Sequence, residues 1–578
     1  MAEKVNLANI IWQAADDELR NVLKPHEYGQ IILPFFVLKR LDSVIKSLDP
    51  NNEARDLYEK NFDMEEDERE RFIFDATELP YYNTAKYNFD EIAKGDANQA
   101  YENFENYIAS FSKNIRTLIE NFKFNDELEE LRKQKRFFSF IQHFAEIDMS
   151  PENYDNAEIG NVYEDLLRRW SEMSNETAGE HFTPKDVVNL LVGIVFSGKK
   201  DELNEPGLIR NIYDPCCGYG GMLTTAKKYI EENISKNVTL VLKGQEINTQ
   251  THSGCAADFI MMGLDSSHII GPSSTLTDDL YTNDKFHFQL ANPPFGVSWN
   301  TGSTVTSVKD ELNSQTFNGR SRFVNLPRTS DGQLLFLQIM IDKMEPNDSR
   351  IGMVSNGSPL FTGDAGSGES EIRKYILEND LLEAMIALPD NMFYNTGIAT
   401  YLWIINNNKS SDRKGKVQLI DGSGLGTALR KNLGNKNKEI SDESREQIID
   451  IFEKFEENEI SKIYDKEFFG YTRVNVEQPL IEDEEIVKLR NGKIKADTSK
   501  RDQERIPLSD NIDDYFDREV KPHLPDAWMD RSKDVIGYEI NFTKYFYKYQ
   551  PLRDLEEIIT DIKAIDKEIE SLSGDLLE

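Results

Sequence analysis

The chain has 578 residues, of which 39% are hydrophobic and 10% aromatic, and its 103 acidic against 67 basic residues give a formal net charge of -36. This length exceeds a single core and predicts about three or four domains. The negative charge argues against a chain-wide nucleic-acid surface, because affinity for phosphate backbones comes largely from Lys and Arg. Any DNA function would therefore need a basic partner.

Cysteine usage and the absence of a long apolar run indicate the cellular compartment. Cys216, Cys217 and Cys255 form neither a disulfide framework nor two spaced zinc knuckles. The first twenty residues lack an apolar targeting core, and the longest apolar run, residues 31–38, is far below a membrane-spanning length. We expect a cytoplasmic protein with no membrane segment and no bound metal.

Three segments with different patterns follow one another along the chain. Residues 1–170 carry apolar side chains at spacings of three and four, which predicts a helical domain, although the acidic stretch 61–83 has no firm assignment. Within 171–420, β-rich runs alternate with helical stretches and predict an α/β domain with a parallel, doubly wound sheet. Residues 421–505 are charged and predict a mostly helical extension.

The final segment, residues 506–578, ends in a helix with apolar residues at steps of three and four. This spacing predicts either a coiled-coil seam that docks on a partner or a helix lying on its own domain. Its apolar positions are Leu555, Ile558, Ile559, Ile562, Ile565, Ile569 and Leu572.

A glycine-rich turn in the α/β segment is the first candidate site. The stretch IYDPCCGYGGML ends a β-like run at Asp214 and passes through Gly218, Gly220 and Gly221 into a helical pattern. Glycine permits positive φ and lets a ligand approach the backbone. The spacing departs from the dinucleotide fingerprint GxGxxG. A tight turn with no ligand remains the alternative.

The next β-like run, VTLVLKGQEIN, ends in Glu246. A carboxylate at the tip of the following strand can accept two hydrogen bonds from the vicinal hydroxyls of a ribose. This placement predicts a nucleoside ligand, whereas a solvated glutamate at a strand end is the alternative.

A third run, FHFQLANPPFG, leaves its strand through Asn292, Pro293, Pro294 and Phe295. The Asn292 amide oxygen and the Pro293 carbonyl, held by two fixed φ angles, can both accept hydrogen bonds from one NH2 group. Phe295 can stack on an extruded base, because an amine inside a duplex is out of reach of a pocket. A plain Asn-Pro-Pro loop is the alternative, but the carboxyl end of such a strand is where ligands bind.

The chain carries the glycine turn, then the ribose carboxylate Glu246, then an amine clamp formed by the Asn292 amide oxygen and the Pro293 carbonyl. This order predicts methyl transfer from S-adenosylmethionine by in-line displacement at the sulfonium carbon. The protein would act through positioning and desolvation. Asp214 would stabilise the cationic sulfonium.

At these residues the chain resembles the modification subunit of type I restriction-modification systems, a family of DNA N6-adenine methyltransferases. The resemblance includes GEHFTPKDVVNLLV, DGQLLFLQIMIDKM and SKIYDKEFFGYTRVNVEQPL, and it covers most of the chain. It implies a Rossmann-like methyltransferase sheet with an N-terminal helical domain and a C-terminal helical tail.

The resemblance also implies residue roles. Asn292 to Phe295 match the catalytic tetrapeptide, and Glu246 matches the ribose carboxylate. The remaining cofactor-site residues that it suggests are Glu180, His181, Phe182, Thr183, Pro184, Lys185, Asp214, Cys216, Gly218, Tyr219, Gly220 and Gly221.

The sequence departs from the family pattern at two places. Tyr219 stands where a small residue is usual, and SSTL at 273–276 replaces the expected Gly-Asn/Asp-Thr-Leu. The polar group for the cofactor adenine is therefore open among Ser274, Asp278 and Asp279. The two adjacent cysteines are more simply small pocket-lining residues than a metal or redox site.

The resemblance implies a complex of two modification subunits with one specificity subunit on double-stranded DNA, to which a separate ATP-driven restriction subunit adds cleavage. The N-terminal helices would contact DNA or the neighbouring subunit, and the C-terminal helix would dock on the specificity subunit. The loop 297–333 is a candidate for DNA contact, with a polar surface loop as the alternative. Its cations are Lys309, Arg320, Arg322 and Arg328.

Two other functions fit part of the pattern. An amide NH2 of protein glutamine, or an RNA base, could occupy the same clamp. A non-catalytic scaffold could keep the fold without activity, although the intact tetrapeptide argues against it.

Overall fold

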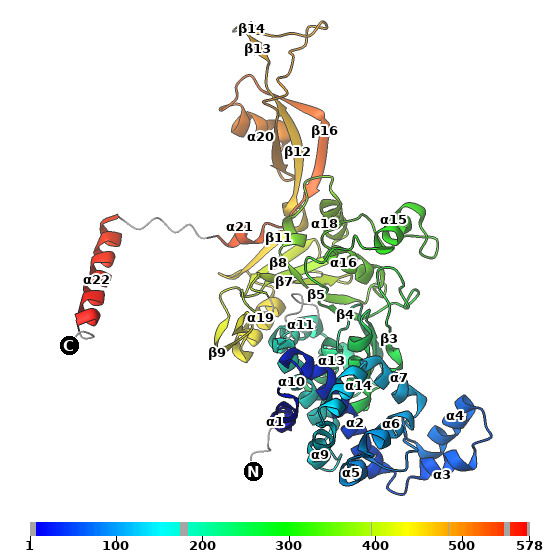
Figure 1. Cartoon of the computed structure of the whole chain (residues 1–578). Coiled ribbons are helices and arrows are strands. Elements are labelled where there is room, and N and C mark those ends of the chain that lie inside the picture. Colours follow the sequence, from blue (N-terminus) through cyan, green and yellow to red (C-terminus); the bar gives the residue numbers. More distant parts are fainter. Residues whose placement is uncertain (1–6, 174–182, 395, 484, 548–554, 575–578) are drawn as a thin grey trace. The chain divides into compact units, whose positions relative to one another are not determined.

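The structure is a computed structural model that describes residues 7–173, 183–394, 396–483, 485–547 and 555–574 (Figure 1). The chain divides into two compact units, Met1–Ile540 and Asn541–Glu578.

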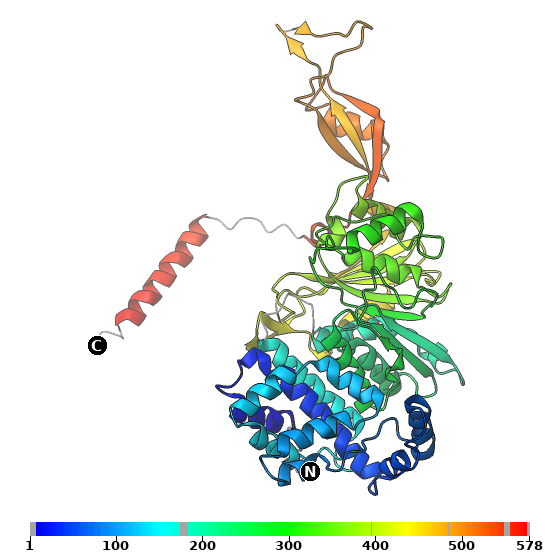
Figure 2. The same cartoon turned by 45° about the vertical axis from the view of Figure 1, so that its right-hand side comes forward.

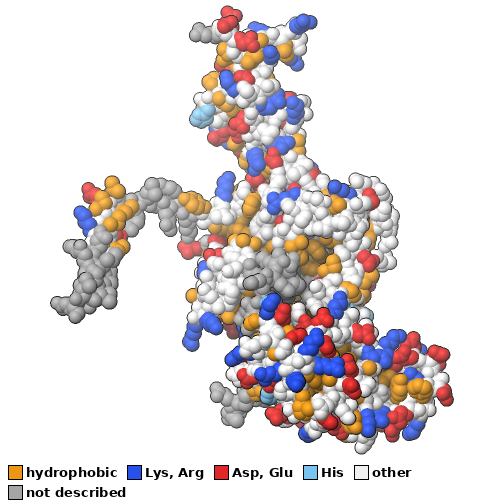
Figure 3. All heavy atoms as spheres, in the orientation of Figure 1, with side chains coloured by type: hydrophobic (Ala, Val, Ile, Leu, Met, Phe, Trp, Pro, Cys, Tyr) orange, Lys and Arg blue, Asp and Glu red, His pale blue; other side chains and the backbone are white. Residues whose placement is uncertain are grey.

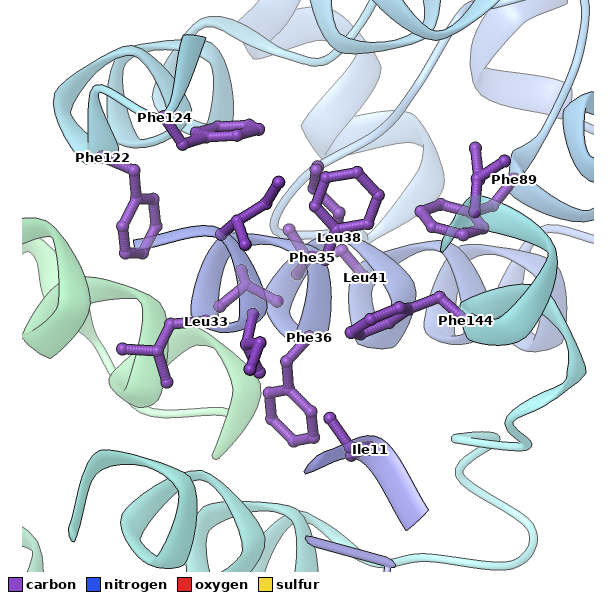
Figure 4. Close-up of a cluster of buried hydrophobic side chains, with 14 of the residues drawn as sticks. Ile11, Leu33, Phe35, Phe36, Leu38, Leu41, Phe89, Phe122, Phe124 and Phe144 are labelled. Carbon is purple, nitrogen blue, oxygen red and sulfur yellow. The ribbon is translucent and has the colours of Figure 1, made fainter. Parts of the chain in front are cut away.

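The first unit begins with a helical domain built around α2 (Tyr28–Leu48). Phe35 of this helix contacts five aromatic rings from other segments. Among them are Phe124 and Phe144, with 6.2 and 5.5 Å between the ring centroids (Figure 4). The buried guanidinium of Arg40 donates to the Met149 carbonyl at 2.6 Å and to Asn156 Oδ1 at 2.9 Å. These contacts tie α2 to the start of α10. The other helices here are α1 (Leu7–Leu19), η1 (Pro25–Glu27), α3 (Glu53–Lys60), α4 (Glu66–Thr77), α5 (Phe89–Lys94), α6 (Ala100–Ala109), α7 (Lys113–Phe122), α8 (Asn125–Lys133), α9 (Phe137–Glu146) and α10 (Asn156–Met173).

A nine-stranded mixed sheet follows, in the order β11-β8-β6-β7-β5-β4-β1-β2-β3. Strands β1 to β5 are mutually parallel, and β7 runs antiparallel between β5 and β6. The chain builds outward from β1 to β3 and then crosses to β4 on the other side of β1. The strand order therefore reverses between β1 and β4, which is where ligands bind in open α/β sheets. The strands are β1 (Ile209–Asp214), β2 (Thr239–Gln245), β3 (Ile269–Ile270), β4 (Phe288–Ala291), β5 (Arg350–Asn356), β6 (Leu382–Ala387), β7 (Thr400–Asn406), β8 (Lys416–Asp421) and β11 (Ser461–Asp465).

Helices cover both faces of the sheet (Figures 1 and 2). Strands β4 to β7 are buried apart from Asn356 at the end of β5, because they lie between these helix layers. The α/β sheet with an N-terminal helical domain, predicted from the sequence, is confirmed, but the sheet is mixed and not parallel throughout, because β7 and β11 pair antiparallel with their neighbours. The helices are α11 (Lys185–Phe196), α12 (Lys200–Leu203), α13 (Gly221–Asn233), α14 (Thr249–Met261), η2 (Ser266–His268), α15 (Thr304–Ser314), α16 (Gln333–Asp342), α17 (Ser358–Phe361), α18 (Gly368–Glu378) and α19 (Asp442–Lys454).

Residues 421–505 differ from the expected helical extension. Among the described residues of this segment only α19 and the short η3 (Lys466–Phe469) are helical, and the rest is divided between strands and loops. The periodicity of α19 is strong, but it does not extend into its neighbours, and β11 completes the main sheet by pairing with β8. A boundary at residue 420 would therefore cut through the sheet. The hairpin β9 (Thr427–Leu433) with β10 (Lys436–Glu439) precedes α19.

An arm of antiparallel strands completes the first unit, with β12 between β15 and β16. Its elements are β12 (Gly470–Glu477), β13 (Ile481–Glu482), β14 (Glu485–Ile486), β15 (Asp502–Pro507), α20 (Ile512–Tyr515), the π-helical η4 (Phe516–Val520) and β16 (Trp528–Tyr538).

The second unit holds α21 (Phe542–Phe546) and α22 (Leu555–Gly574). Of the apolar residues expected along the final helix, those whose side chains are described are exposed in α22: Leu555, Ile558, Ile559, Ile562 and Ile565. Among the helices described, none combines the length and apolar character needed to cross a membrane.

Candidate active site

A cavity of about 450 Å³ opens where the strand order reverses. Its walls come from the ends of β1 and β4, from α13 and α14, and from α10 of the helical domain. It is large enough for a nucleoside-sized ligand. Eight predicted site residues line it: Thr183, Lys185, Asp214, Cys216, Gly218, Tyr219, Gly221 and Asn292.

The glycine turn after β1 requires glycine at Gly220. This residue has φ +83°, and a Cβ there would lie 2.6 Å from the Cys255 Sγ. Its amide donates to the Cys217 carbonyl at 2.8 Å, which closes the turn at the start of α13. Gly218 also has positive φ, at 55°. Gly220 itself is buried, whereas Gly218 and Gly221 line the cavity and leave the backbone there open to a ligand.

Asp214 ends β1 as a carboxyl group that is only 2% exposed. Burial raises its pKa to about 7, and the nearby Glu246 carboxylate adds to this rise, while a hydrogen bond from the Cys216 amide to Asp214 Oδ1, at 3.0 Å, opposes it. A buried carboxyl that ionises near neutral pH is suited to a cationic ligand, because the cation removes the cost of ionisation.

Asn292 follows β4 with its side chain held in one orientation. Its Nδ2 donates to the Thr183 hydroxyl at 2.9 Å. Its Oδ1 is buried and accepts no hydrogen bond from any residue that the structure describes. An unsatisfied buried acceptor is costly and signals a missing donor. The amide oxygen is therefore free to accept a hydrogen bond, and its role toward a ligand NH group stays a prediction.

Phe295 is buried in the core below the cavity. Its ring packs edge-on against Phe393, with 5.6 Å between the centroids, and it is 7% exposed. Neither Phe295 nor the two prolines, Pro293 and Pro294, line the cavity. Stacking of Phe295 on a base stays a prediction.

Glu246, expected to bind a ribose, lies at the end of β2 behind the glycine turn. Its two carboxylate oxygens accept from the Gly218 amide at 3.0 Å and the Asn248 amide at 2.8 Å. A carboxylate has about four acceptor sites, so two remain for ligand hydroxyls. The residue is 8% exposed and does not line the cavity itself.

The cysteines and Tyr219 contribute to packing. Burial raises the pKa of the Cys216 thiol well above its usual value, and it keeps the thiol protonated. Tyr219 lies against Gly254, where an added Cβ would be 2.4 Å from the Tyr219 ring, and its ring is 6.4 Å from that of Trp170. Tyr219 thus joins the glycine turn to α10 and α14. Within the described part of the chain, no cluster of His, Cys, Asp and Glu could hold a metal ion.

The candidates for the cofactor adenine do not line the cavity. Asp279 is fully buried and pairs with Lys343 at 2.9 Å and with Arg322 at 3.0 Å. These pairs place its carboxylate in a structural ion network. Ser274 and Asp278 are partly and largely exposed, respectively, and neither lines the cavity.

The cations predicted to contact DNA have different surroundings. Arg322 is 6% exposed and also pairs with Glu311, so the structure does not support its role at a phosphate. Arg320 forms an ion pair with Asp342. Arg328 and Lys309 are exposed, unlike Arg322.

The remaining predicted residues are Pro184 and the run Glu180, His181 and Phe182. Pro184 precedes the first residue of α11 and does not line the cavity. Glu180, His181 and Phe182 lie outside the described residues.

Several lining residues carried no recognised signal in the sequence. Glu164 of α10 pairs with Lys185 at 2.5 Å across the cavity wall. Asp258 of α14 is 8% exposed, and burial raises its pKa well above the usual range, with the Glu164 carboxylate as a second cause. A lone carboxyl in the apolar run CAADFIMM is a signal that could have identified Asp258.

These features define the chain as an α/β protein with a nucleoside-sized cavity at a glycine turn and an orphaned amide oxygen. The chain belongs to the N-6 DNA methylase family, whose sequence model matches residues 154–482, and the model of the HsdM N-terminal domain matches residues 7–144. The family resemblance stated from the sequence is confirmed.

Two relatives are methylase subunits of type I restriction enzymes. The HindI methylase subunit of Haemophilus influenzae is 30% identical over 268 residues, which cover 46% of this chain and 55% of the relative. The MjaIX methylase subunit of Methanocaldococcus jannaschii is 28% identical over 320 residues, covering 55% and 53%. The chain spans about half the length of these relatives.

The fold is also similar to a solved structure. The methyltransferase subunit of the type I restriction-modification system from Streptococcus thermophilus superposes with a TM-score of 0.64 at 22% identity. The match covers 80% of this chain and 95% of that one, and it supports the fold.

Proposed function

We propose that this chain transfers a methyl group from S-adenosylmethionine to N6 of an adenine turned out of duplex DNA. The observation that carries the proposal is the orphaned, buried Asn292 Oδ1 in a cavity that also holds Asp214 and the glycine turn. Membership of the N-6 DNA methylase family supports the choice of DNA and of adenine N6.

The residues present fit this cofactor. Gly218 and Gly221 line the cavity without side chains, so a ligand can approach the backbone there, and Glu246 keeps free acceptor sites for ribose hydroxyls. Asp214, once ionised, would stabilise a sulfonium. When bound, S-adenosylmethionine supplies an electrophilic methyl carbon with a neutral thioether as leaving group.

The chain activates the amine by orienting it. Asn292 Oδ1 and the Pro293 carbonyl would accept the two N6 hydrogens, and Thr183 holds the amide so that its oxygen points to the ligand. These two bonds favour a tetrahedral nitrogen whose lone pair is aimed at the methyl group. As the N–C bond forms and the C–S bond breaks, the nitrogen gains positive charge and then releases one proton to solvent. The chain therefore contributes positioning and a low-dielectric site.

We also propose that the chain works in a cytoplasmic complex with a second copy, a DNA-reading specificity subunit and, for cleavage, an ATP-dependent subunit. The exposed apolar residues of α22 support docking on a partner, and the net charge of -36 supports weak DNA binding by this chain alone.

A transfer assay separates this function from its alternatives. Tritiated cofactor is incubated with the purified chain and its co-purifying partners, and with duplex DNA, RNA or protein as acceptor. We expect label in DNA. Label only in protein or RNA would refute the proposal, and the absence of transfer to all three with intact cofactor binding would favour a scaffold.

A further inference from the structure

The β9–β10 hairpin carries a local excess of positive charge in a strongly acidic chain. Residues 427–439, which form the hairpin, include Arg430, Lys431, Lys436 and Lys438 and a single acidic residue, Glu439. Figure 3 shows Lys and Arg side chains at the outer edge of the region where Figure 1 places β9. The family features of the sequence did not account for this cluster.

Two of the four cations hold the hairpin in place, and two remain free. Lys436 Nζ is buried and pairs with Asp186 at 3.0 Å, and Lys438 pairs with Asp390. Arg430 and Lys431 are exposed, and neither forms an ion pair or a hydrogen bond through its side chain with any described residue. These two are therefore available to an anionic partner.

The loop that follows β6 contacts the hairpin and links it to the proposed target site. The Asn435 amide donates to the Tyr394 carbonyl at 2.7 Å, and the Asn437 amide donates to the Asn391 carbonyl at 3.1 Å. Within this loop, Phe393 packs against Phe295 of the catalytic tetrapeptide. The loop thus links the hairpin to the end of β4.

A second link runs through the start of α11. Asp186, which accepts from Lys436 Nζ and from the Ile440 amide at 2.9 Å, lies three residues after Thr183. The Thr183 hydroxyl in turn holds the Asn292 amide. Both elements that fix the amine clamp therefore also fix the hairpin.

We propose that the β9–β10 hairpin is a DNA-contact surface, on which Arg430 and Lys431 bind backbone phosphates of the duplex next to the extruded adenine. This inference rests on the proposed function. A two-stranded ribbon with free cations can lie along a DNA groove, and phosphate contacts of this kind fix register without reading sequence. It also places positive charge beside the target site, which Arg322, buried among carboxylates, does not.

Counterion release gives the expected loss of DNA affinity when the two cations are removed. Each neutralised phosphate contributes about 0.9 to the slope of log affinity against log salt, so two contacts contribute about 1.8. At 0.1 M salt the loss of both corresponds to a weakening of roughly 10- to 60-fold.

The test is the double variant Arg430→Gln/Lys431→Gln in the full chain with its co-purifying partners. Methyl transfer to unmethylated plasmid DNA is measured against DNA concentration at several salt concentrations. The matched control is Lys488→Gln/Arg490→Gln, which removes the same two charges from exposed residues of the arm that form no ion pair with any described residue. Cofactor affinity and thermal midpoint check that each variant is folded.

We expect the hairpin variant to raise KM for DNA by the stated factor with kcat and cofactor affinity unchanged, and with a shallower salt dependence. The control should keep the wild-type KM within about twofold, a change of only ~0.4 kcal/mol. Equal KM values for wild type and hairpin variant, or equal losses in both variants, would overturn the inference. Loss of a co-purifying protein with unchanged DNA kinetics would overturn it in favour of a protein contact. If the wild type itself transfers no label to DNA, the proposed function fails first.

Discussion

Replacement of Asp214 by asparagine should stabilise the chain without ligand and at the same time weaken cofactor binding. Asp214 is buried, and burial raises its pKa from 3.8 to about 7. This shift corresponds to about 4 kcal/mol of free energy for keeping the carboxylate ionised. Asparagine keeps an oxygen for the hydrogen bond from the Cys216 amide and does not ionise.

The way in which stability changes with pH follows from proton binding by Asp214. The folded state holds the Asp214 proton more tightly than the unfolded state, so the stability that this group contributes is full below about pH 4 and is lost as pH rises through about 7. We therefore expect Asp214→Asn to be more stable than the wild type at pH 8, by up to about 4 kcal/mol, and this difference to shrink to about 1 kcal/mol at pH 4.5. Chemical denaturation midpoints of both proteins at the two pH values measure this difference.

Binding of S-adenosylmethionine, in contrast to folding, should favour the ionised form of Asp214. A sulfonium favours ionised Asp214, so wild-type affinity for S-adenosylmethionine should fall about tenfold per pH unit below pH 7. The neutral product S-adenosylhomocysteine is the matched ligand and should show a weaker dependence. Titration calorimetry from pH 5.5 to 8 tests both. The same pH dependence for the two ligands, or equal stability of wild type and Asp214→Asn at pH 8, would refute this role for Asp214.

Three further changes test other parts of the site and the tail. Glu246→Gln keeps an acceptor for the Gly218 amide but loses charge toward the ribose, so cofactor affinity should fall by about 10- to 100-fold, and unchanged affinity in calorimetry would exclude the ribose role. Gly220→Ala forces a Cβ to within 2.6 Å of Cys255 Sγ at positive φ and should lower the stability measured by thermal unfolding by on the order of 1–3 kcal/mol. In the control Gly221→Ala the added Cβ meets nothing within 4 Å, so stability should hardly change. Equal losses of stability in the two variants would contradict the strain assigned to Gly220. Ile562→Asp/Ile565→Asp on α22 should abolish co-purification of a partner while Lys563→Glu retains it, and retention by both would argue against docking through the apolar residues.

Much of the site could be predicted because its chemistry depends on local sequence. The glycine turn requires positive φ at Gly220, and the tetrapeptide at Asn292 follows directly after a short apolar strand, so both patterns are visible along the chain. The order of these patterns also predicts that their strand ends meet, because carboxyl ends of parallel strands share one edge of a sheet.

The parts that could not be predicted depend on contacts between distant segments. Arg322 lies in a polar loop and gives no local sign that Asp279 and Glu311 surround it. The cavity wall formed by Glu164 comes from the helical domain, and periodicity alone does not say which of its faces meets the sheet. Strand β11 follows a strongly helical segment, and its place in the sheet is set by pairing with β8, which is about forty residues away in the sequence.

Nucleoside analysis of DNA after reaction tests the central claim most directly. Unmethylated plasmid is incubated with S-adenosylmethionine and either the wild-type chain or Asn292→Ala, each with its co-purifying partners, and the digested DNA is examined by mass spectrometry. The orphaned Asn292 oxygen predicts N6-methyladenine with the wild type, and none with Asn292→Ala despite retained cofactor binding. A methylated cytosine as the product, or equal N6-methyladenine from both proteins, would contradict it.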